Sequence, residues 1–326
     1  MAELGPIDYS TLDRPEVLQR LFHPRAEYEK PVSGSGATDI LIPVAEGVRI
    51  GARFHITDKT APNILFFHGN GEIVSDYDDF GPVYNRMGIN FLPVDYRGYG
   101  RSNGNPTVSD MMGDAVAVFE FARRWLAENG CTGPLVVMGR SLGSASALEL
   151  ASRYPDAIAG LIVESGFAYA GPLLALLGVR LDSLEFDEAK GFRNIDKIRE
   201  FNRPVLVIHA EHDHIIPFSD GQALYSASVS RDKTLLKIPQ ADHNTIFAYG
   251  LREYMAAVRS FADRVIRDAP RKCSGPHTHA PRGAFTSRHL PSNPRRSRPE
   301  VQAMISRSCA SPPMLVFSES MSRFRF

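Results

Sequence analysis

The sequence predicts an α/β protein built on a doubly wound, mainly parallel β-sheet, and two observations predict it. Short apolar runs recur along the chain, and amphipathic helical stretches separate most of them. Such regular alternation is typical of a parallel sheet with helices on both faces. The predicted strands are residues 63–67, 90–94, 135–138, 160–163, 205–209 and 234–238. The predicted helices are residues 74–87, 109–128, 142–154, 218–229 and 245–266.

The segments that flank this alternation predict the domain boundaries. Residues 1–36 form an N-terminal extension, with a short helix at 15–22 and a connector rich in Pro, Gly and Ser at 31–36. Residues 37–269 form the main domain. Its residues 47–56 alternate apolar and polar side chains, which predicts a half-exposed antiparallel edge strand.

The composition after residue 269 differs sharply from the rest of the chain. Residues 271–326 contain ten Lys and Arg against two acidic residues, and seven prolines. Such a segment buries too little apolar surface to offset the entropy of ordering it, so we expect 270–326 to be a disordered basic tail. Contact of this tail with acidic partners or a membrane surface is the alternative.

The whole chain has 326 residues, and its 37 basic residues balance 37 acidic ones. This neutrality gives no electrostatic case for a nucleic-acid partner. No basic and apolar N-terminal signal is apparent, and no apolar run reaches membrane-spanning length. The cysteines Cys131, Cys273 and Cys309 are scattered. We therefore expect a reduced, cytoplasmic protein without stable membrane insertion, and the oligomeric state stays open.

One interval departs from the regular alternation of strands and helices. Between Glu164 and Val205 the chain is far longer than one helix requires, and it contains an apolar stretch at 171–178. We interpret residues 166–201 as a small lid over the mouth of a site; an ordinary crossover helix with a long loop is the alternative. In the lid interpretation, the residues that partly face substrate include Leu173, Leu174 and Leu177.

The strand at 135–138 leads directly into Gly-Arg-Ser-Leu-Gly at 139–143, and a helix follows. A Gly-x-Ser-x-Gly sequence at a tight strand-to-helix turn holds its serine clear of the sheet, near backbone N–H groups at the helix N-terminus. The two glycines leave room for the turn because they have no Cβ. This context predicts that Ser141 is a nucleophile rather than part of a chance match.

A serine hydroxyl needs a base and an orienting acid, which follow in the order acid, then histidine, in doubly wound hydrolases. Asp213 and His243 each lie just beyond the end of a late strand, where catalytic groups collect. They are the predicted acid and base. Glu164, at the end of the strand after Ser141, is the alternative acid.

His209, His212 and His214 also suggest a metal cluster around Asp213, but this crowded run lacks a matching distant ligand. We expect no metal and no cofactor.

Acyl transfer also requires donors for the developing oxyanion. The strand 63–67 ends in His-Gly-Asn-Gly at 68–71, a glycine-rich turn at the same sheet edge. The backbone N–H groups of Asn70 and Leu142 are the predicted oxyanion hole, against the alternative that the turn is structural only. The loop 95–102, with Arg97 and several glycines, is interpreted as a scaffold beside this turn.

Together these motifs resemble an α/β-hydrolase-fold serine hydrolase of the small-lid kind, similar to the BEM46-like and ABHD17-like group. The resemblance spans about residues 40–268 and rests on the motifs at 68–71, 95–102, 139–143, 211–217 and 242–244. It implies ester or thioester hydrolysis with Ser141 as nucleophile, Asp213 as acid and His243 as base. The depalmitoylating relatives carry a cysteine-rich N-terminus for lipid anchoring. This chain has no cysteine before Cys131, which argues against depalmitoylation at membranes.

The predicted function is therefore a serine hydrolase that cleaves small-molecule carboxylic esters or thioesters through an acyl-enzyme. A peptidase or amidase on the same triad is the first alternative. A non-catalytic binding protein that retains the fold is the second, because a fold alone does not establish a function.

Overall fold

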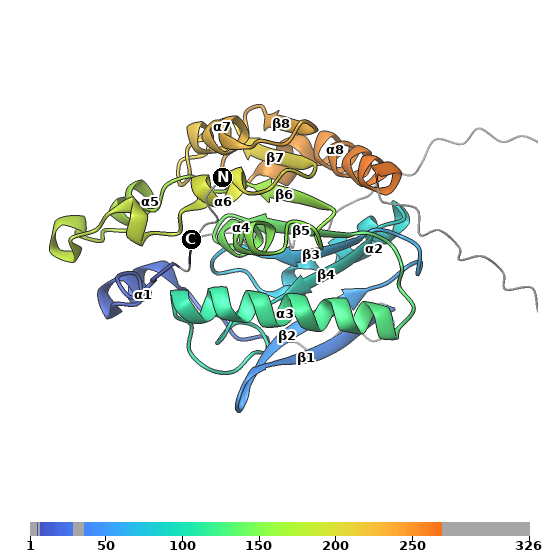
Figure 1. The fold of residues 1–326 in the computed structure, drawn as a ribbon, viewed down its shortest axis with the longest axis horizontal. Helices are drawn as coiled ribbons and strands as arrows, with labels where there is room; N and C mark the ends of the chain where they lie inside the picture. Colours follow the sequence, from blue (N-terminus) through green and yellow to red (C-terminus); the bar gives the residue numbers. More distant parts are fainter. Residues whose placement is uncertain (1–4, 6, 29–35, 269–326) are drawn as a thin grey trace, which may run out of the picture. The chain divides into compact units, whose positions relative to one another are not determined.

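A computed structural model describes residues 5, 7–28 and 36–268, and it confirms the predicted α/β fold with a mainly parallel sheet (Figure 1). The predicted connector at 31–36 lies almost entirely outside the described residues, and the predicted tail at 270–326 lies wholly outside them. The eight-stranded sheet has the order β1-β2-β4-β3-β5-β6-β7-β8. Its strands are β1 (Ala37–Ala45), β2 (Val48–His55), β3 (Asn63–Phe67), β4 (Asn90–Val94), β5 (Leu135–Arg140), β6 (Gly160–Glu164), β7 (Val205–Ala210) and β8 (Lys233–Ile238).

The first two strands differ from the prediction. The predicted edge strand at 47–56 is β2, but it pairs with β4 on one side and with β1 on the other, and most of its side chains are buried. The edge strand on this side of the sheet is β1, which the sequence did not reveal. Its Pro43 interrupts the pattern of a strand, and an edge position tolerates a residue that lacks an N–H group.

Helices cover both faces of the sheet, as predicted. On one face α3 packs on α4, α4 on α6 and α6 on α7, while α2 and α8 pack on the other. Their bounds are α2 (Phe80–Arg86), α3 (Val108–Glu128), α4 (Gly143–Arg153), α6 (Asn194–Arg199), α7 (Phe218–Ala227) and α8 (Ile246–Asp268). The single helix predicted at 74–87 was wrong, because this segment is divided into a short 3-10 helix, η1 (Val74–Tyr77), and α2.

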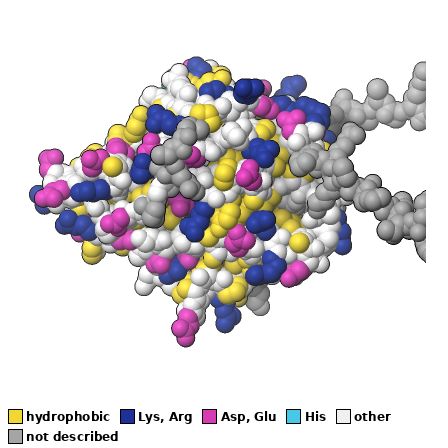
Figure 2. Space-filling model, in the orientation of Figure 1, with side chains coloured by type: hydrophobic (Ala, Val, Ile, Leu, Met, Phe, Trp, Pro, Cys, Tyr) yellow, Lys and Arg dark blue, Asp and Glu magenta, His cyan; other side chains and the backbone are white. Residues whose placement is uncertain are grey.

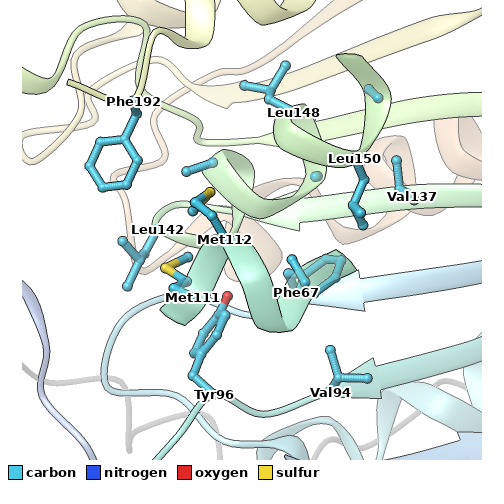
Figure 3. Packing of buried hydrophobic residues seen from close by; sticks show 14 of the residues in the cluster. Phe67, Val94, Tyr96, Met111, Met112, Val137, Leu142, Leu148, Leu150 and Phe192 are labelled. Atoms are coloured by element: carbon cyan, nitrogen blue, oxygen red, sulfur yellow. The ribbon is translucent and has the colours of Figure 1, made fainter. Parts of the chain in front are cut away.

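The main core lies between the sheet and the helices of the α3–α4 face. Figure 3 shows Phe67 and Val137 on neighbouring strands, with Leu148 and Leu150 of α4 among the buried residues beside them. Leu142, which follows Ser141, is also buried in this cluster. Its side chain therefore anchors the start of α4 in the core, while its backbone stays at the strand end.

The described N-terminal residues pack on this same core. Leu12, Val17 and Leu21 are buried, the last two on α1 (Pro15–Leu21). Asp13 accepts hydrogen bonds from the N–H groups of Val108 (2.7 Å) and Ser109 (3.1 Å) at the start of α3. The predicted N-terminal extension thus contains a segment that belongs to the compact unit formed by the main domain.

The interval predicted as a lid contains α5 (Ala170–Leu176), the 3-10 helices η2 (Leu181–Leu184) and η3 (Glu188–Lys190), and α6. In Figure 1, α5 and α1 lie beyond the same end of the sheet, and the two helices contact each other. Leu174 is fully buried in the core, which argues against the predicted substrate contact of that residue. Leu173 and Leu177 are only partly buried, so the prediction for these two stays open.

The surface shows no gathering of one sign of charge on the face in Figure 2, where basic and acidic side chains are interspersed. Within the described residues, none of the helices combines the length and apolar character needed to cross a bilayer.

Candidate active site

The turn that carries Ser141 is a strained strand-to-helix corner. Ser141 has a φ of 51°, in the left-handed region that L-residues rarely adopt. A Cβ on Gly139 would lie 2.2 Å from the carbonyl oxygen of Gly143, and one on Gly143 would lie 2.2 Å from that of Phe67. Both positions therefore require glycine, and the start of α4 packs directly against the end of β3.

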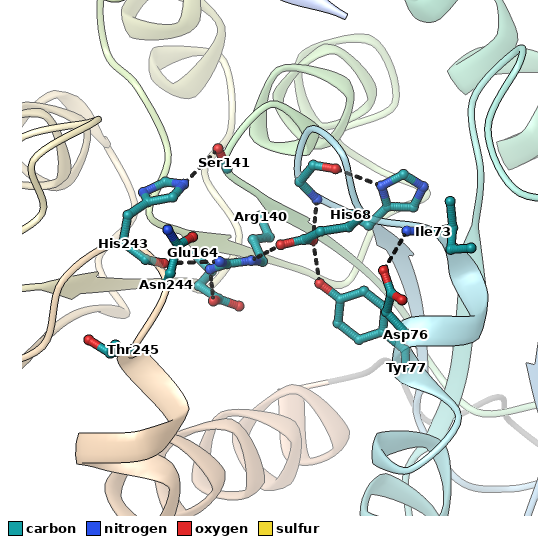
Figure 4. A network of polar contacts seen from close by, with 12 residues as sticks. His68, Ile73, Asp76, Tyr77, Arg140, Ser141, Glu164, His243, Asn244 and Thr245 are labelled. Atoms are coloured by element: carbon teal, nitrogen blue, oxygen red, sulfur yellow. Dashed lines mark hydrogen bonds and ion pairs between the residues drawn. The ribbon is translucent and has the colours of Figure 1, made fainter. Parts of the chain in front are cut away.

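Three residues from distant parts of the chain form a continuous hydrogen-bonded series. His243 Nε2 lies 3.0 Å from Ser141 Oγ, and His243 Nδ1 lies 2.7 Å from Asp213 Oδ2. The side-chain contact of Ser141 with His243 is visible in Figure 4. All three residues are buried. With the Nδ1 proton donated to Asp213, Nε2 is free to accept the serine proton, which is the arrangement that a general base requires.

Asp213 is held from its other side as well. Its Oδ1 accepts hydrogen bonds from the backbone N–H groups of Ile215 (3.0 Å) and Ile216 (2.8 Å). Burial alone would raise the pKa of Asp213, but the hydrogen bonds from His243 and from the backbone of Ile216 hold that pKa below its usual value. Asp213 is therefore a fixed, ionised carboxylate at neutral pH.

Glu164, the alternative acid, is engaged elsewhere. Its Oε1 accepts a hydrogen bond from Arg140 Nη1 at 2.6 Å, and its Oε2 accepts one from Tyr254 Oη at 2.7 Å. The geometry thus favours Asp213 as the partner of His243. Glu164 still touches the site through its backbone, because its carbonyl oxygen accepts a hydrogen bond from the N–H of Ser141 at 2.8 Å.

Both predicted oxyanion donors are available. Within the described part of the chain, neither the N–H of Asn70 nor that of Leu142 donates a hydrogen bond to the protein. Leu142 precedes α4, whose N-terminus adds the positive end of its dipole beside Ser141. Asn70 lies in the loop after β3, and Leu142 lies at the start of α4. The close contact of Gly143 with the end of β3 brings these two segments together.

The loop with Asn70 is anchored by residues whose role the sequence did not indicate. The side-chain oxygen of Asn70 accepts hydrogen bonds from Tyr99 Oη (2.7 Å) and from the N–H of His23 (3.0 Å). Tyr96 Oη donates to the carbonyl oxygen of His68 at 2.6 Å. The segment predicted as a scaffold therefore contacts the predicted oxyanion turn directly, through its two tyrosines.

The histidines near Asp213 have other partners. His209 Nε2 lies 2.8 Å from the carbonyl oxygen of Ile216 and 3.5 Å from Asp213 Oδ2. His212 lies near Glu211 on the surface. Among the residues that the structure describes, there is no group of three or more side chains arranged to hold a metal ion.

Two charged residues next to the Ser141 turn were not predicted from the sequence. Arg140 precedes Ser141, and Glu72 follows the turn at 68–71; both are buried and form an ion pair. The signal was present: Arg140 ends an apolar strand at a position that an isolated charge does not occupy, because a buried cation requires a partner. The sequence did not indicate which carboxylate that partner is.

Fold and site together define an α/β hydrolase, and comparisons with known proteins agree. Residues 58–182 match the family model described as serine aminopeptidase S33. Est1E from Butyrivibrio proteoclasticus, solved with ferulic acid, superimposes with a TM-score of 0.58 at 21% identity, over 70% of this chain and 99% of that chain.

Two curated relatives extend the likeness to most of the domain. The chain is 31% identical to human alpha/beta hydrolase domain-containing protein 17B over 236 residues, which are 68% of this chain and 73% of that protein. It is 28% identical to alpha/beta hydrolase domain-containing protein WAV2 of Arabidopsis thaliana, over 73% of this chain and 82% of that protein. The chain belongs to the α/β-hydrolase family, in the group of alpha/beta hydrolase domain-containing protein 17.

Proposed function

We propose that the protein is a serine hydrolase that cleaves carboxylic ester or thioester bonds through an acyl-enzyme. The observation that carries this proposal is the series from Ser141 Oγ through His243 to Asp213, with distances of 3.0 and 2.7 Å. It supports the roles of nucleophile, base and orienting acid for these residues, which are the roles that acyl transfer needs.

In the proposed reaction, Ser141 Oγ attacks the carbonyl carbon of the substrate while its proton passes to His243 Nε2. The negative charge on the substrate oxygen is stabilised by the N–H groups of Asn70 and Leu142. His243 then gives the proton to the leaving alcohol or thiol, and the acyl group stays on Ser141. Water, activated by His243, attacks the acyl-enzyme, and the acid leaves as Ser141 regains its proton.

The first experiment is labelling by a fluorophosphonate probe, which reacts with activated serines. We expect the wild type to be labelled and Ser141→Ala not to be. Ser146→Ala is a matched control, because Ser146 is a buried serine of α4 whose hydroxyl has no hydrogen-bond partner among the residues that the structure describes. Equal labelling of wild type and Ser141→Ala would falsify the proposal, and a folded wild type without any labelling would favour a non-catalytic binding protein.

The second experiment defines the bond that is cleaved. Acyl esters of p-nitrophenol and acyl thioesters, each in a series of increasing chain length, are expected substrates. The Leu173 and Leu177 side chains, partly buried in the lid segment, are the proposed contacts of the acyl chain. Substituting each by alanine tests this, and the expected result is a change in chain-length preference with no loss of fluorophosphonate labelling.

A peptidase or amidase on the same triad is the second candidate, favoured by the aminopeptidase description of the matching family model. That match ends before Asp213 and His243, and the triad chemistry is common to both reactions. Aminoacyl p-nitroanilides separate the two candidates: faster hydrolysis of the anilides than of matched esters would favour the peptidase.

A further inference from the structure

Arg140 makes contacts that join the segments on both sides of Ser141. Its Nε donates to Glu72 Oε1 (2.8 Å), its Nη1 to Glu164 Oε1 (2.6 Å) and its Nη2 to the backbone carbonyl oxygen of His243 (3.0 Å). These partners come from the loop after β3, from the end of β6 and from the loop after β8. Figure 4 shows Arg140 between His243 on one side and Tyr77 on the other.

The contact with Glu72 extends to the peptide that carries the N–H of Asn70. Glu72 Oε2 accepts hydrogen bonds from the N–H of Gly69 (2.7 Å) and from Tyr77 Oη (2.6 Å), and the N–H of Glu72 donates to the carbonyl oxygen of Gly69 (3.3 Å). Because a peptide group is planar and trans, fixing the carbonyl of Gly69 also fixes the direction of the Asn70 N–H. His68 Nδ1 donates to the same carbonyl oxygen at 2.8 Å.

The other side of the guanidinium extends to the base. The contact with the His243 carbonyl fixes the backbone from which the imidazole projects, and Tyr254 of α8 holds the remaining oxygen of Glu164 at 2.7 Å. A cation with several donors in a rigid plane is needed for this set of contacts, and an ammonium group cannot span it.

The network is a costly way to stabilise a fold. The Arg140, Glu72 and Glu164 side chains are at most 6% exposed, and buried ion pairs add little stability over apolar residues of the same volume. Burial would raise the pKa of Glu72, but the charge of Arg140 holds it below its usual value, and burial would lower the pKa of Arg140, but its two carboxylates raise it. The charges therefore persist, and their arrangement fixes geometry.

We propose that Arg140 is a positioning residue: through Glu72 it aligns the Asn70 N–H with Ser141, and through its own contact with the His243 carbonyl it aligns the imidazole. This inference rests on the proposed function, because it assigns a role in the transition state of acyl transfer. Groups that act in the transition state affect kcat and leave KM nearly unchanged. Misalignment of a single oxyanion donor costs about as much as its removal, which is on the order of 100-fold in kcat.

The test compares Arg140→Lys and Glu72→Gln with Arg53→Lys. Arg53 is a matched control, because it is a 3% exposed guanidinium on β2 that pairs with Asp39, Asp78 and Glu27, outside the contacts that reach the candidate site. Each variant is assayed for kcat and KM on p-nitrophenyl butyrate and for inhibition by phenylboronic acid, whose tetrahedral serine adduct places an oxygen in the oxyanion hole.

We expect Arg140→Lys and Glu72→Gln to lower kcat by about 10- to 100-fold and to lower the affinity for phenylboronic acid by a similar factor. The KM of both variants is expected to stay within about threefold of the wild-type value. Arg53→Lys, in its folded state, is expected to keep the wild-type kcat. If Arg140→Lys does not fold, the nearly isosteric Glu72→Gln decides the matter. A kcat and a boronic acid affinity equal to those of Arg53→Lys overturn the positioning role.

The two proposals fail in different ways. A wild type that neither hydrolyses the ester nor reacts with a fluorophosphonate removes the proposed function, and the positioning role falls with it. A wild type that does both, beside Arg140→Lys and Glu72→Gln variants with unchanged kcat, removes the positioning role and leaves the proposed function intact.

Discussion

The carboxylate of Asp213 lies 2.7 Å from His243 Nδ1, and the remaining oxygen of the same carboxylate is held by two backbone N–H groups. The acid is thus fixed by its own loop before it meets the imidazole, so it is able to impose one tautomer and one orientation on His243.

Replacing Asp213 by asparagine is therefore expected to lower kcat by about 10⁴-fold while the protein stays folded, because an amide stabilises the wrong imidazole tautomer. Glu164→Gln tests the alternative acid. We expect this variant to lose far less kcat than Asp213→Asn, since Glu164 contacts Arg140 rather than the imidazole. Steady-state hydrolysis of p-nitrophenyl butyrate measures both. A larger loss in Glu164→Gln than in Asp213→Asn contradicts the assignment of the acid.

Substitution of Gly143 tests how tightly the strand-to-helix turn at Ser141 is packed. A Cβ at this position would lie 2.2 Å from the carbonyl oxygen of Phe67, and backbone atoms cannot yield as a flexible side chain does. We expect Gly143→Ala to lower the free energy of unfolding by about 3 kcal/mol, measured by urea denaturation. The control is Gly113→Ala on α3, where a Cβ would meet nothing within 4 Å and alanine is expected to stabilise the helix by about 1 kcal/mol. Equal effects of the two substitutions would show that the corner has room.

His55 predicts a pH dependence of stability. Burial first, and the nearby Arg53 charge second, lower the pKa of His55 from 6.5 to about 4. The unfolded chain therefore takes up the proton at higher pH than the folded chain does. The contribution to stability is complete above pH 6.5 and is lost as the pH falls to about 4, and it amounts to about 3 kcal/mol.

His55→Leu is the variant that isolates this effect. In the described part of the chain, neither ring nitrogen of His55 has a hydrogen-bond partner, so a leucine of similar volume is expected to cost less than about 1.5 kcal/mol of stability at pH 8. Between pH 6.5 and 4 the variant is expected to lose less stability than the wild type, as urea unfolding at each pH measures. The same acid-side loss in both proteins would show that His55 does not cause it.

The N-terminal segment is expected to contribute to the stability of the whole domain. Leu12 is fully buried, and Leu12→Ala is expected to lower the free energy of unfolding by about 3 kcal/mol. Gln19→Ala on the exposed side of α1 is the control, with an expected effect within about 0.5 kcal/mol. Thermal unfolding in both variants measures the difference, and an unchanged Tm for Leu12→Ala would mean that the segment is dispensable.

The parallel strands and the candidate triad were both predictable from the sequence, and for the same physical reason. A buried strand requires a short apolar run, and polar residues that follow such runs collect at one sheet edge, so Ser141, Asp213 and His243 could be paired without coordinates. The edge strand β1 was missed because its pattern includes Pro43 and polar side chains, which an exposed strand tolerates. The positions of the ends of η1 and α2 depend on packing that no local pattern records.

The polar network was harder to predict than the triad. A triad has residue types in a known order, whereas the identity of Arg140's partners depends on how two loops and the end of β6 meet. Leu174 illustrates the same limit for apolar residues, since four leucines in a short stretch look alike in the sequence, and only packing separates a core residue from a lid surface.

The contacts of Tyr9 have a consequence for protein synthesis. Its hydroxyl donates to Glu149, which lies 140 residues later, and accepts from the buried Lys197, 188 residues later. A ribosome exposes Tyr9 long before either partner exists. The segment that carries Tyr9 therefore remains without these two partners until most of the domain has been translated. These contacts therefore form only after residues far later in the chain have been made.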